Sequence, residues 1–285
     1  MISRRVVGRV EPLWAGRTHV GRRRKENQDQ FLIAELTRNL RIDDTSLHLD
    51  DPPAYSVGQA VVFLVADGMG GQAAGDRASA LVVRSMAEQL IEATPWSGRP
   101  GDVDEDALHQ ALIEAVARSR RAILADTERA PERQGMGTTL TMAYLLWPRL
   151  HLVHVGDSRC YLMREGKLSR LTTDHTLAHQ LVEAGALDPA QEGDSPLSHV
   201  LWNVVDAGQE QRPPPDIVTH DLEPDDMLLL CTDGLTRHVP DERIALLLDR
   251  YRNPVMACEA LIEAANAGGG SDNIAVVVAR LQDRD

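Results

Sequence analysis

Three aspartates of the 285-residue chain stand just after short apolar runs, a position from which carboxylates can bind metal ions: Asp67, Asp157 and Asp233. A carboxylate at the end of a buried strand is held rigidly while its oxygens project into a cleft, and a neighbouring glycine lets a main-chain carbonyl or water approach the same point. Converging carboxylates repel one another unless a hard cation lies between them, and all-oxygen ligation suits Mg²⁺ or Mn²⁺ rather than zinc. The pattern therefore indicates a site for divalent cations.

Each of these aspartates is weak evidence by itself, because Asp-Gly is among the commonest turn dipeptides. The chain nevertheless carries a series of short polar motifs, in the order 24–29 (RKENQD), 67–71 (DGMGG), 137–139 (GTT), 156–159 (GDSR), 232–234 (TDG) and 271–273 (SDN). In that order and at those separations, the series resembles the metal-dependent protein phosphatase family, type 2C, and especially its bacterial serine/threonine phosphatases. The resemblance extends from about Thr18 to Val278.

The resemblance implies two divalent cations in each chain, Mn²⁺ or Mg²⁺. Asp67 corresponds to the ligand that bridges both cations, with the Gly68 carbonyl on one of them. Asp233 and Asp272 correspond to ligands of the other cation. Asp29 corresponds to a residue in the shell of the first cation, directly or through water. These five residues are the metal ligands that the resemblance predicts.

Phosphate binding is implied for Arg24, which stands where the family has its phosphate-binding arginine. A planar guanidinium can hold two phosphate oxygens at once. The resemblance thus implies hydrolysis of phosphoserine and phosphothreonine monoesters in proteins by a metal-activated water, with Arg24 and Asp67 as catalytic residues. The implied partners are phosphorylated protein substrates, namely a serine/threonine kinase or its targets, and the chain would oppose that kinase.

Three positions depart from the family pattern. Met69 replaces a histidine proposed as a general acid in members from higher organisms, and a thioether cannot donate a proton. Gln28 replaces a glutamate found in some members. Arg237 replaces an aspartate that helps Asp157 hold a third metal, and a guanidinium repels a cation. We therefore predict that the possible third metal at Asp157 is weak or absent, or that Arg237 pairs with Asp157.

Two other functions remain open at this point. A catalytically weak member of the same fold would act as a phosphoprotein-binding module, and the three departures favour this alternative. A phosphatase of small phosphate esters would use the same site, because the chemistry is indifferent to what lies beyond the ester oxygen. Hydrolysis is preferred to binding alone because all five aspartate and arginine positions of the two-metal site are present: Arg24, Asp29, Asp67, Asp233 and Asp272.

The periodicity of apolar residues predicts the elements that hold these side chains. Strands are expected at 60–66, 138–146, 150–155, 161–163, 227–231 and 274–281, and helices at 76–91, from a cap at Asp104 or Asp106 to 126, at 174–184, 241–250 and 255–267. The family implies an α+β fold, an α-β-β-α sandwich of two antiparallel sheets flanked by helices. We expect one phosphatase domain over 1–285, with its core at about 11–282, a mobile acidic insertion at 38–58 and a flap-like region at 179–215.

The histidines are weaker candidates for chemistry. His151 and His154 are an odd number of residues apart in one predicted strand, so they should point to opposite faces and cannot form a simple metal pair. His175 is expected to cap a helix or lie at the surface, and His199 to line the substrate approach. The acidic composition of the flap-like region favours substrates with basic residues beside the phosphorylated site.

The overall composition limits the partners of the chain. A formal net charge of −13 argues against nucleic acid or an anionic membrane surface as a partner, because either polyanion would be repelled. The three cysteines form no CxxC pair, which fits a reducing compartment and a structural role. No apolar run reaches the length of a membrane span. We expect a cytoplasmic monomer that binds neither nucleic acid nor membrane.

Overall fold

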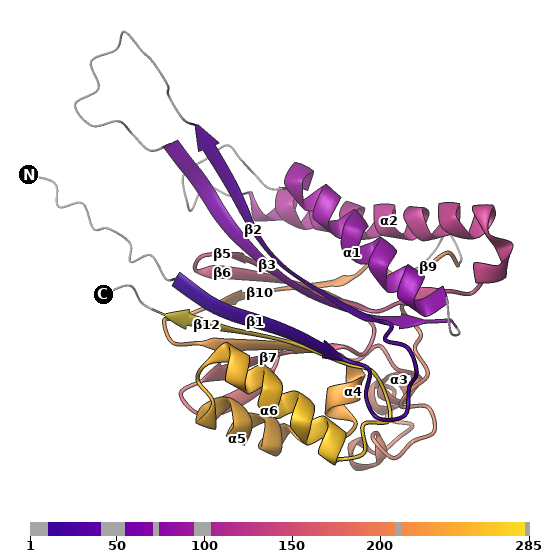
Figure 1. Cartoon of the computed structure of the whole chain (residues 1–285). Coiled ribbons are helices and arrows are strands. Elements are labelled where there is room, and N and C mark those ends of the chain that lie inside the picture. The colour runs from indigo at the N-terminus through magenta and orange to yellow at the C-terminus, as the bar shows by residue number, and fades with distance from the viewer. Residues whose placement is uncertain (1–10, 41–54, 71–73, 94–103, 209–211, 283–285) are drawn as a thin grey trace, which may run out of the picture.

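The structure is a computed structural model that describes residues 11–40, 55–70, 74–93, 104–208 and 212–282. Two antiparallel sheets are stacked face to face, and helices cover the outer face of each sheet (Figure 1). The expected α-β-β-α sandwich is therefore confirmed. Among the described residues, no helix has the length and apolarity that crossing a bilayer requires.

The first sheet has seven strands in the order β10-β6-β5-β3-β4-β9, with β2 also paired to β3. Its strands are β2 (Asp29–Leu40), β3 (Tyr55–Met69), β4 (Gly137–Thr138), β5 (Leu140–Leu146), β6 (Arg149–Val155), β9 (Val205–Asp206) and β10 (Asp216–Asp221). The second sheet has five strands in the order β1-β12-β11-β7-β8. Its strands are β1 (Glu11–His19), β7 (Arg159–Arg164), β8 (Lys167–Arg170), β11 (Met227–Cys231) and β12 (Ile274–Gln282).

Helices on the two outer faces shield the sheets. The helices of the described residues are α1 (Ala74–Ala93), α2 (Glu105–Arg129), α3 (Leu177–Glu183), α4 (Asp233–Thr236), α5 (Asp241–Arg250) and α6 (Pro254–Ala267), with short 3₁₀ helices η1 (Pro131–Arg133) and η2 (Pro189–Gln191). The predicted cap at Asp104 is confirmed, since its carboxylate accepts a 3.0 Å hydrogen bond from the Ala107 backbone N–H at the start of α2. Helices α1 and α2 lie on the first sheet, and α5 and α6 lie on the second (Figure 1).

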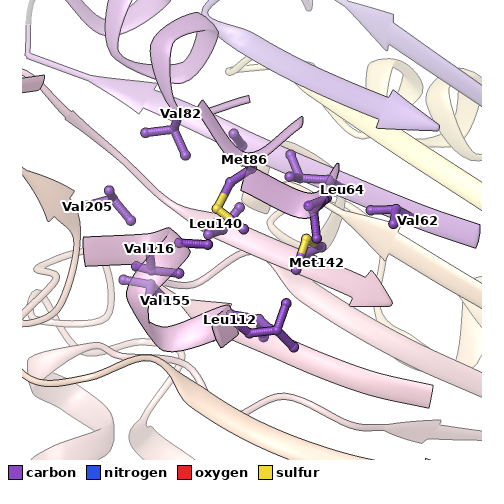
Figure 2. Close-up of a cluster of buried hydrophobic side chains, with 14 of the residues drawn as sticks. Val62, Leu64, Val82, Met86, Leu112, Val116, Leu140, Met142, Val155 and Val205 are labelled. Carbon is purple, nitrogen blue, oxygen red and sulfur yellow. The ribbon is translucent and has the colours of Figure 1, made fainter. Parts of the chain in front are cut away.

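Strand β3 shows how the sequence builds the layers, because its successive side chains alternate between two apolar cores. Val62 and Leu64 pack against the helices of the first sheet, whereas Val61 and Phe63 face the second sheet. Figure 2 shows Leu64 of β3, which lies in the same apolar layer as residues of α1 and α2. A strand buried on both faces reads as a continuous apolar run, which is why the segment 60–66 was recognisable in the sequence.

Shortening Leu112 tests the packing of this outer layer. The side chain of Leu112 in α2 is fully buried against the first sheet, so Leu112→Ala is expected to lower the free energy of unfolding by about 3 kcal/mol through lost burial and the cavity left behind. Chemical denaturation measures the change. Leu246→Ala is the matched control, since Leu246 of α5 is 62% exposed and its truncation should cost less than about 0.5 kcal/mol.

Several predicted boundaries of strands and helices differ from those in the structure. The strand expected at 60–66 extends over Tyr55–Met69, and the helix expected at 174–184 begins only at Leu177. An insertion was expected at 38–58, but β2 continues to Leu40 and β3 starts at Tyr55. The remaining residues of that range, 41–54, lie outside the described residues. The flap-like region 179–215 begins inside α3 and includes η2 and β9.

Candidate metal and phosphate site

Four of the predicted carboxylates come from segments that meet at one end of the sandwich. Asp29 begins β2 and lies directly opposite Asp67 near the end of β3. Asp233 begins α4 immediately after β11, and Asp272 lies in the loop that leads into β12. The charges of Asp29, Asp233 and Asp272 all act on Asp67. The structure therefore brings together the acids that the motifs singled out.

Burial and neighbouring acidic charges raise the pKa of Asp29 and that of Asp67. Burial raises the pKa of Asp29 to about 8, and the charges of Asp233 and Asp272 act in the same direction, against a hydrogen bond from the Thr232 hydroxyl. Burial also raises the pKa of Asp67 well above its usual range, with the charges of Asp29 and Asp233 adding to the effect. The cluster thus carries more negative charge than its surroundings neutralise.

Two oxygens of the cluster are suitable for a hard cation. Asp29 Oδ1 and Asp233 Oδ1 are buried and have no hydrogen-bond partner in the described part of the chain. Because an unsatisfied buried carboxylate oxygen is costly, a divalent cation with oxygen ligands fits this donor set. No three acidic, histidine or cysteine side chains of the described ranges are already grouped to hold an ion, since Asp233 and Asp272 pair with arginines instead.

The two threonines of the GTT motif hold the backbone of Asp67 in position through hydrogen bonds. The Asp67 backbone N–H donates to Thr139 Oγ1 at 3.0 Å, and the Asp67 carbonyl accepts from Thr138 Oγ1 at 2.8 Å. Thr139 Oγ1 also lies 2.8 Å from Ser158 Oγ, in the loop that carries Asp157. The two threonines therefore link the end of β3 to the third-metal candidate, a role that the motif alone did not reveal.

At two glycines of the site, a neighbouring backbone lies so close that a side chain would not fit. A Cβ at Gly68 would overlap the Gly75 carbonyl oxygen, and the Gly68 backbone N–H donates to the Gln28 carbonyl at 3.2 Å. A Cβ at Gly234 would overlap the Asn273 carbonyl oxygen. The glycines after Asp67 and Asp233 thus let the neighbouring segments reach the carboxylates.

Asn273 fastens the N-terminal loop of the site. Its Oδ1 accepts from the Gln28 backbone N–H at 2.9 Å, and its Nδ2 donates to the carbonyls of Val20 and Glu26 at 3.0 and 2.9 Å. These bonds bind the loop that carries Arg24 to the segment that carries Asp272. Sequence reasoning assigned no role to Asn273, although an amide inside the SDN motif is a signal for such a loop contact.

We expect Asn273→Ala to cost about 2 kcal/mol of folding free energy, because three backbone groups lose their partner. The loosened loop should also lower kcat/KM by about tenfold, the lower end of the range for residues that orient ligands. Thermal unfolding and steady-state kinetics measure the two effects. Asn273→Asp keeps the acceptor oxygen but loses both donor hydrogens, so it should also destabilise the chain. An unchanged free energy of unfolding in both variants would contradict the role of Asn273 in holding the loop.

Two arginines converge on the carboxylates. Arg24, whose side chain is 54% exposed, binds Asp272 through two contacts of 2.8 Å, Nε to Oδ1 and Nη2 to Oδ2. Arg237 forms an ion pair with Asp233, and its Nη1 lies 3.6 Å from Asp272 Oδ2. The predicted pairing of Arg237 with Asp157 is therefore wrong, because α4 turns Arg237 back over Asp233, four residues earlier. Arg22, Arg23 and Lys25 are exposed, as expected.

A cleft of about 630 Å³ lies beside the carboxylates and is lined in part by Asp157, His199, Asp233 and Arg237. His199 thus lines the approach, as expected. Asp157 is only 8% exposed, and burial raises its pKa to about 8, with the charges of Asp233 and Asp174 adding to this and that of Arg237 opposing it.

His175 was wrongly expected at a cap or the surface. It is 2% exposed, its Nδ1 accepts from the Gly156 backbone N–H at 3.2 Å, and its Nε2 lies 3.1 Å from Asp216 Oδ2. The helix begins only after His175, so this side chain turns inward and supports the loop before Asp157. His151 and His154 do point to opposite faces of β6, where they meet His109 and Thr141 respectively.

Comparison with known proteins agrees with this site. The profile of the family described as "Protein phosphatase 2C" matches residues 39–266. The chain belongs to the protein phosphatase 2C family. This membership agrees with the layered fold.

Individual members of the protein phosphatase 2C family give the same picture. The serine/threonine protein phosphatase PstP of Mycobacterium tuberculosis is 40% identical over 228 residues, which cover 79% of this chain and 41% of PstP. The serine/threonine phosphatase stp of Listeria monocytogenes is 32% identical over 217 residues, which cover 76% of this chain and 83% of stp. The chain thus spans less than half the length of PstP but most of stp.

A solved structure extends the comparison to three dimensions. The crystal structure of the catalytic domain of PstP in complex with two manganese ions matches with a TM-score of 0.73 at 33% identity, covering 96% of this chain and 99% of that one. The chain therefore shares the fold of the PstP catalytic domain over nearly all of its length.

Proposed function

We propose that this chain is a protein serine/threonine phosphatase that hydrolyses phosphoserine and phosphothreonine monoesters and opposes a serine/threonine kinase. The observation that carries the proposal is the group of buried, mutually repelling carboxylates beside a cleft, with an exposed arginine on Asp272. Membership of the phosphatase 2C family and the likeness to PstP and stp support it. Its substrates would be phosphorylated proteins.

Two Mn²⁺ or Mg²⁺ ions are proposed as cofactors, on the support of the PstP catalytic domain crystallised with two manganese ions. When bound, such cations lower the pKa of water and neutralise charge on phosphoryl oxygens. Asp67 and the Gly68 carbonyl would hold them together with Asp29, Asp233 and Asp272. The unpartnered oxygens Asp29 Oδ1 and Asp233 Oδ1 are consistent with this ligand set.

Other side chains at the site would bind the phosphate and orient a metal ligand. Arg24 would leave Asp272 to bind two phosphate oxygens of the substrate through its planar fork. The Thr232 hydroxyl donates to Asp29 Oδ2 at 2.7 Å, and the other oxygen, Oδ1, would remain available to a cation. Met69 has no proton to give, so the leaving alkoxide would take its proton from solvent.

Substrate choice is proposed to lie along the cleft. Glu192 and Asp174 contribute negative charge to its lining, but Arg159 and Arg170 line it as well, and Arg159 already pairs with Asp174 at 2.7 Å. A preference for basic flanking residues would therefore depend on Glu192. A panel of phosphothreonine peptides with basic or acidic flanks measures it, and equal rates would refute the preference.

We further propose that the chain acts as a single domain and a monomer in the cytoplasm. The three free, buried cysteines, Cys160, Cys231 and Cys258, are consistent with a reducing compartment. The net charge of −13 supports the absence of nucleic-acid partners.

One assay tests the function. Purified protein with Mn²⁺ should hydrolyse both an aryl phosphate and a phosphothreonine peptide, and a chelator should stop both reactions. Hydrolysis of the aryl ester alone would favour a phosphatase of small esters. Tight binding of the peptide without turnover would favour the phosphoprotein-binding module.

A further inference from the structure

The exposed residue Arg237 lies beside the carboxylates, and its side chain is partly shielded from water. Its side chain is 30% exposed, compared with 54% for Arg24. Its backbone N–H donates to the Asp233 carbonyl at 2.9 Å, which fixes the residue one helical turn after the metal-ligand candidate. The side chain lines the cleft beside Asp157 and His199. A guanidinium that is partly shielded from water at this position is stabilised by an anionic partner.

The present partners of Arg237 are the carboxylates expected to bind cations. Arg237 pairs with Asp233 and approaches Asp272 Oδ2 to 3.6 Å, the same oxygen that Arg24 Nη2 contacts at 2.8 Å. The two guanidiniums therefore meet at one carboxylate, Arg24 from the exposed loop and Arg237 from the cleft wall. Oxygens that coordinate divalent cations are poorer acceptors for guanidinium groups, so metal binding at Asp233 and Asp272 would release both arginines.

We propose that Arg237 is a second phosphate-binding arginine, which holds the substrate phosphate from the cleft wall while Arg24 holds it from the loop. This inference rests on the proposed phosphatase function. Once Asp233 and Asp272 bind cations, Arg237 remains held by α4 at the cleft and needs a new anion. A phosphate monoester, with several charged oxygens, offers each guanidinium an oxygen pair.

A surface ion pair on a helix is the simpler explanation, and it makes a different prediction. An exposed pair four residues apart contributes little and serves no ligand, so its loss would leave phosphate binding unchanged. Arg237 instead reaches two acids from distant segments, and its charge also acts on Asp157 and Asp67. It thus sits where it can contact whatever anion lies between the carboxylates and the cleft.

Titration of inorganic phosphate into Mn²⁺-loaded protein, followed by calorimetry, tests the proposal. Arg237→Met should weaken phosphate binding about tenfold, the effect of losing one charged hydrogen-bonding group. The affinity for Mn²⁺, titrated separately, should stay the same or increase because a competitor for Asp233 is gone. Arg243→Met is the matched control, since Arg243 is exposed on α5, and it should change neither affinity.

Unchanged phosphate affinity in Arg237→Met, with tighter Mn²⁺ binding, would overturn the proposal, because Arg237 would then only compete with the metal. If this variant does not fold, Arg237→Lys replaces it and should weaken phosphate binding about threefold, since an ammonium lacks the planar fork. Equal affinity in the lysine variant would overturn the proposal too. Turnover of a phosphothreonine peptide by the unsubstituted chain is measured in parallel, so that failure of the proposed function is recognised separately.

Discussion

Replacing Asp67 with asparagine is expected to lower hydrolysis by on the order of 10³-fold while making the metal-free protein more stable. The carboxylate of Asp67 is repelled by the charges of Asp29 and Asp233 in a buried site. Because the amide of asparagine is neutral, the substitution removes this repulsion, which destabilises the folded state. At pH 8 the gain should be about 1–2 kcal/mol of unfolding free energy. The same amide is a poor ligand for the cations that the reaction requires.

Activity assays with Mn²⁺ and calorimetric unfolding in a chelator measure the two opposite effects. Asp249→Asn is the matched control, because Asp249 is an exposed carboxylate of α5 and its loss should leave both quantities unchanged. A variant at position 67 that lost stability in the chelator would contradict the electrostatic account of the cluster, even if its activity disappeared.

In the absence of metal, stability is expected to fall by on the order of 4 kcal/mol for each of two raised carboxyl groups, Asp29 and Asp157, between pH 5 and pH 8. The pKa of Asp29 and that of Asp157 are both raised to about 8 by burial, whereas an unfolded aspartate titrates near about 3.9. Over this interval the folded chain binds more protons than the unfolded chain, so raising the pH favours unfolding. The stabilisation that these two carboxyl groups contribute is complete below their pKa in the unfolded chain. It is lost as the pH rises through their pKa in the folded chain.

Mn²⁺ should reverse this trend, because cations replace the protons on the carboxylates. At about 100 times its dissociation constant, the metal should add about 2.7 kcal/mol at pH 8. Denaturation curves at several pH values, with chelator or with Mn²⁺, measure both effects, and Asp29→Asn should flatten the metal-free curve. A metal-free protein that became more stable from pH 5 to pH 8 would contradict the raised pKa values.

The elements predicted well from the sequence are those whose signals are local. The strand Met227–Cys231 and the helix Asp241–Arg250 have the predicted bounds, because an unbroken apolar run and an amphipathic period each depend on neighbouring residues. Asp67 and Asp233 stood out beside Asp-Gly turns, whereas Asp29 and Asp272 were assigned only through the resemblance to the family. Strand β1 was not assigned, since its pairing with β12 joins opposite ends of the sequence.

The partners of the site residues were harder to predict than the residues themselves. As one alternative, Arg237 was expected to pair with Asp157, but its ion pair after the short helix α4 is with Asp233, and the Asp-Gly at the start of α4 had indicated only a turn. The contacts of Asn273 reach residues about 250 positions earlier. Such pairings are set by tertiary packing, which no local pattern encodes.

Strand β1 pairs with β12, and Asn273 hydrogen-bonds to the loop near Arg24. Both contacts have a consequence for folding during protein synthesis. A ribosome delivers the loop with Arg24 about 250 residues before the segment with Asp272 and Asn273. Until that segment has emerged and β12 has paired with β1, the nascent polypeptide lacks the hydrogen bonds that hold its arginine loop. We therefore expect the proposed phosphatase activity to appear only after β12 has docked.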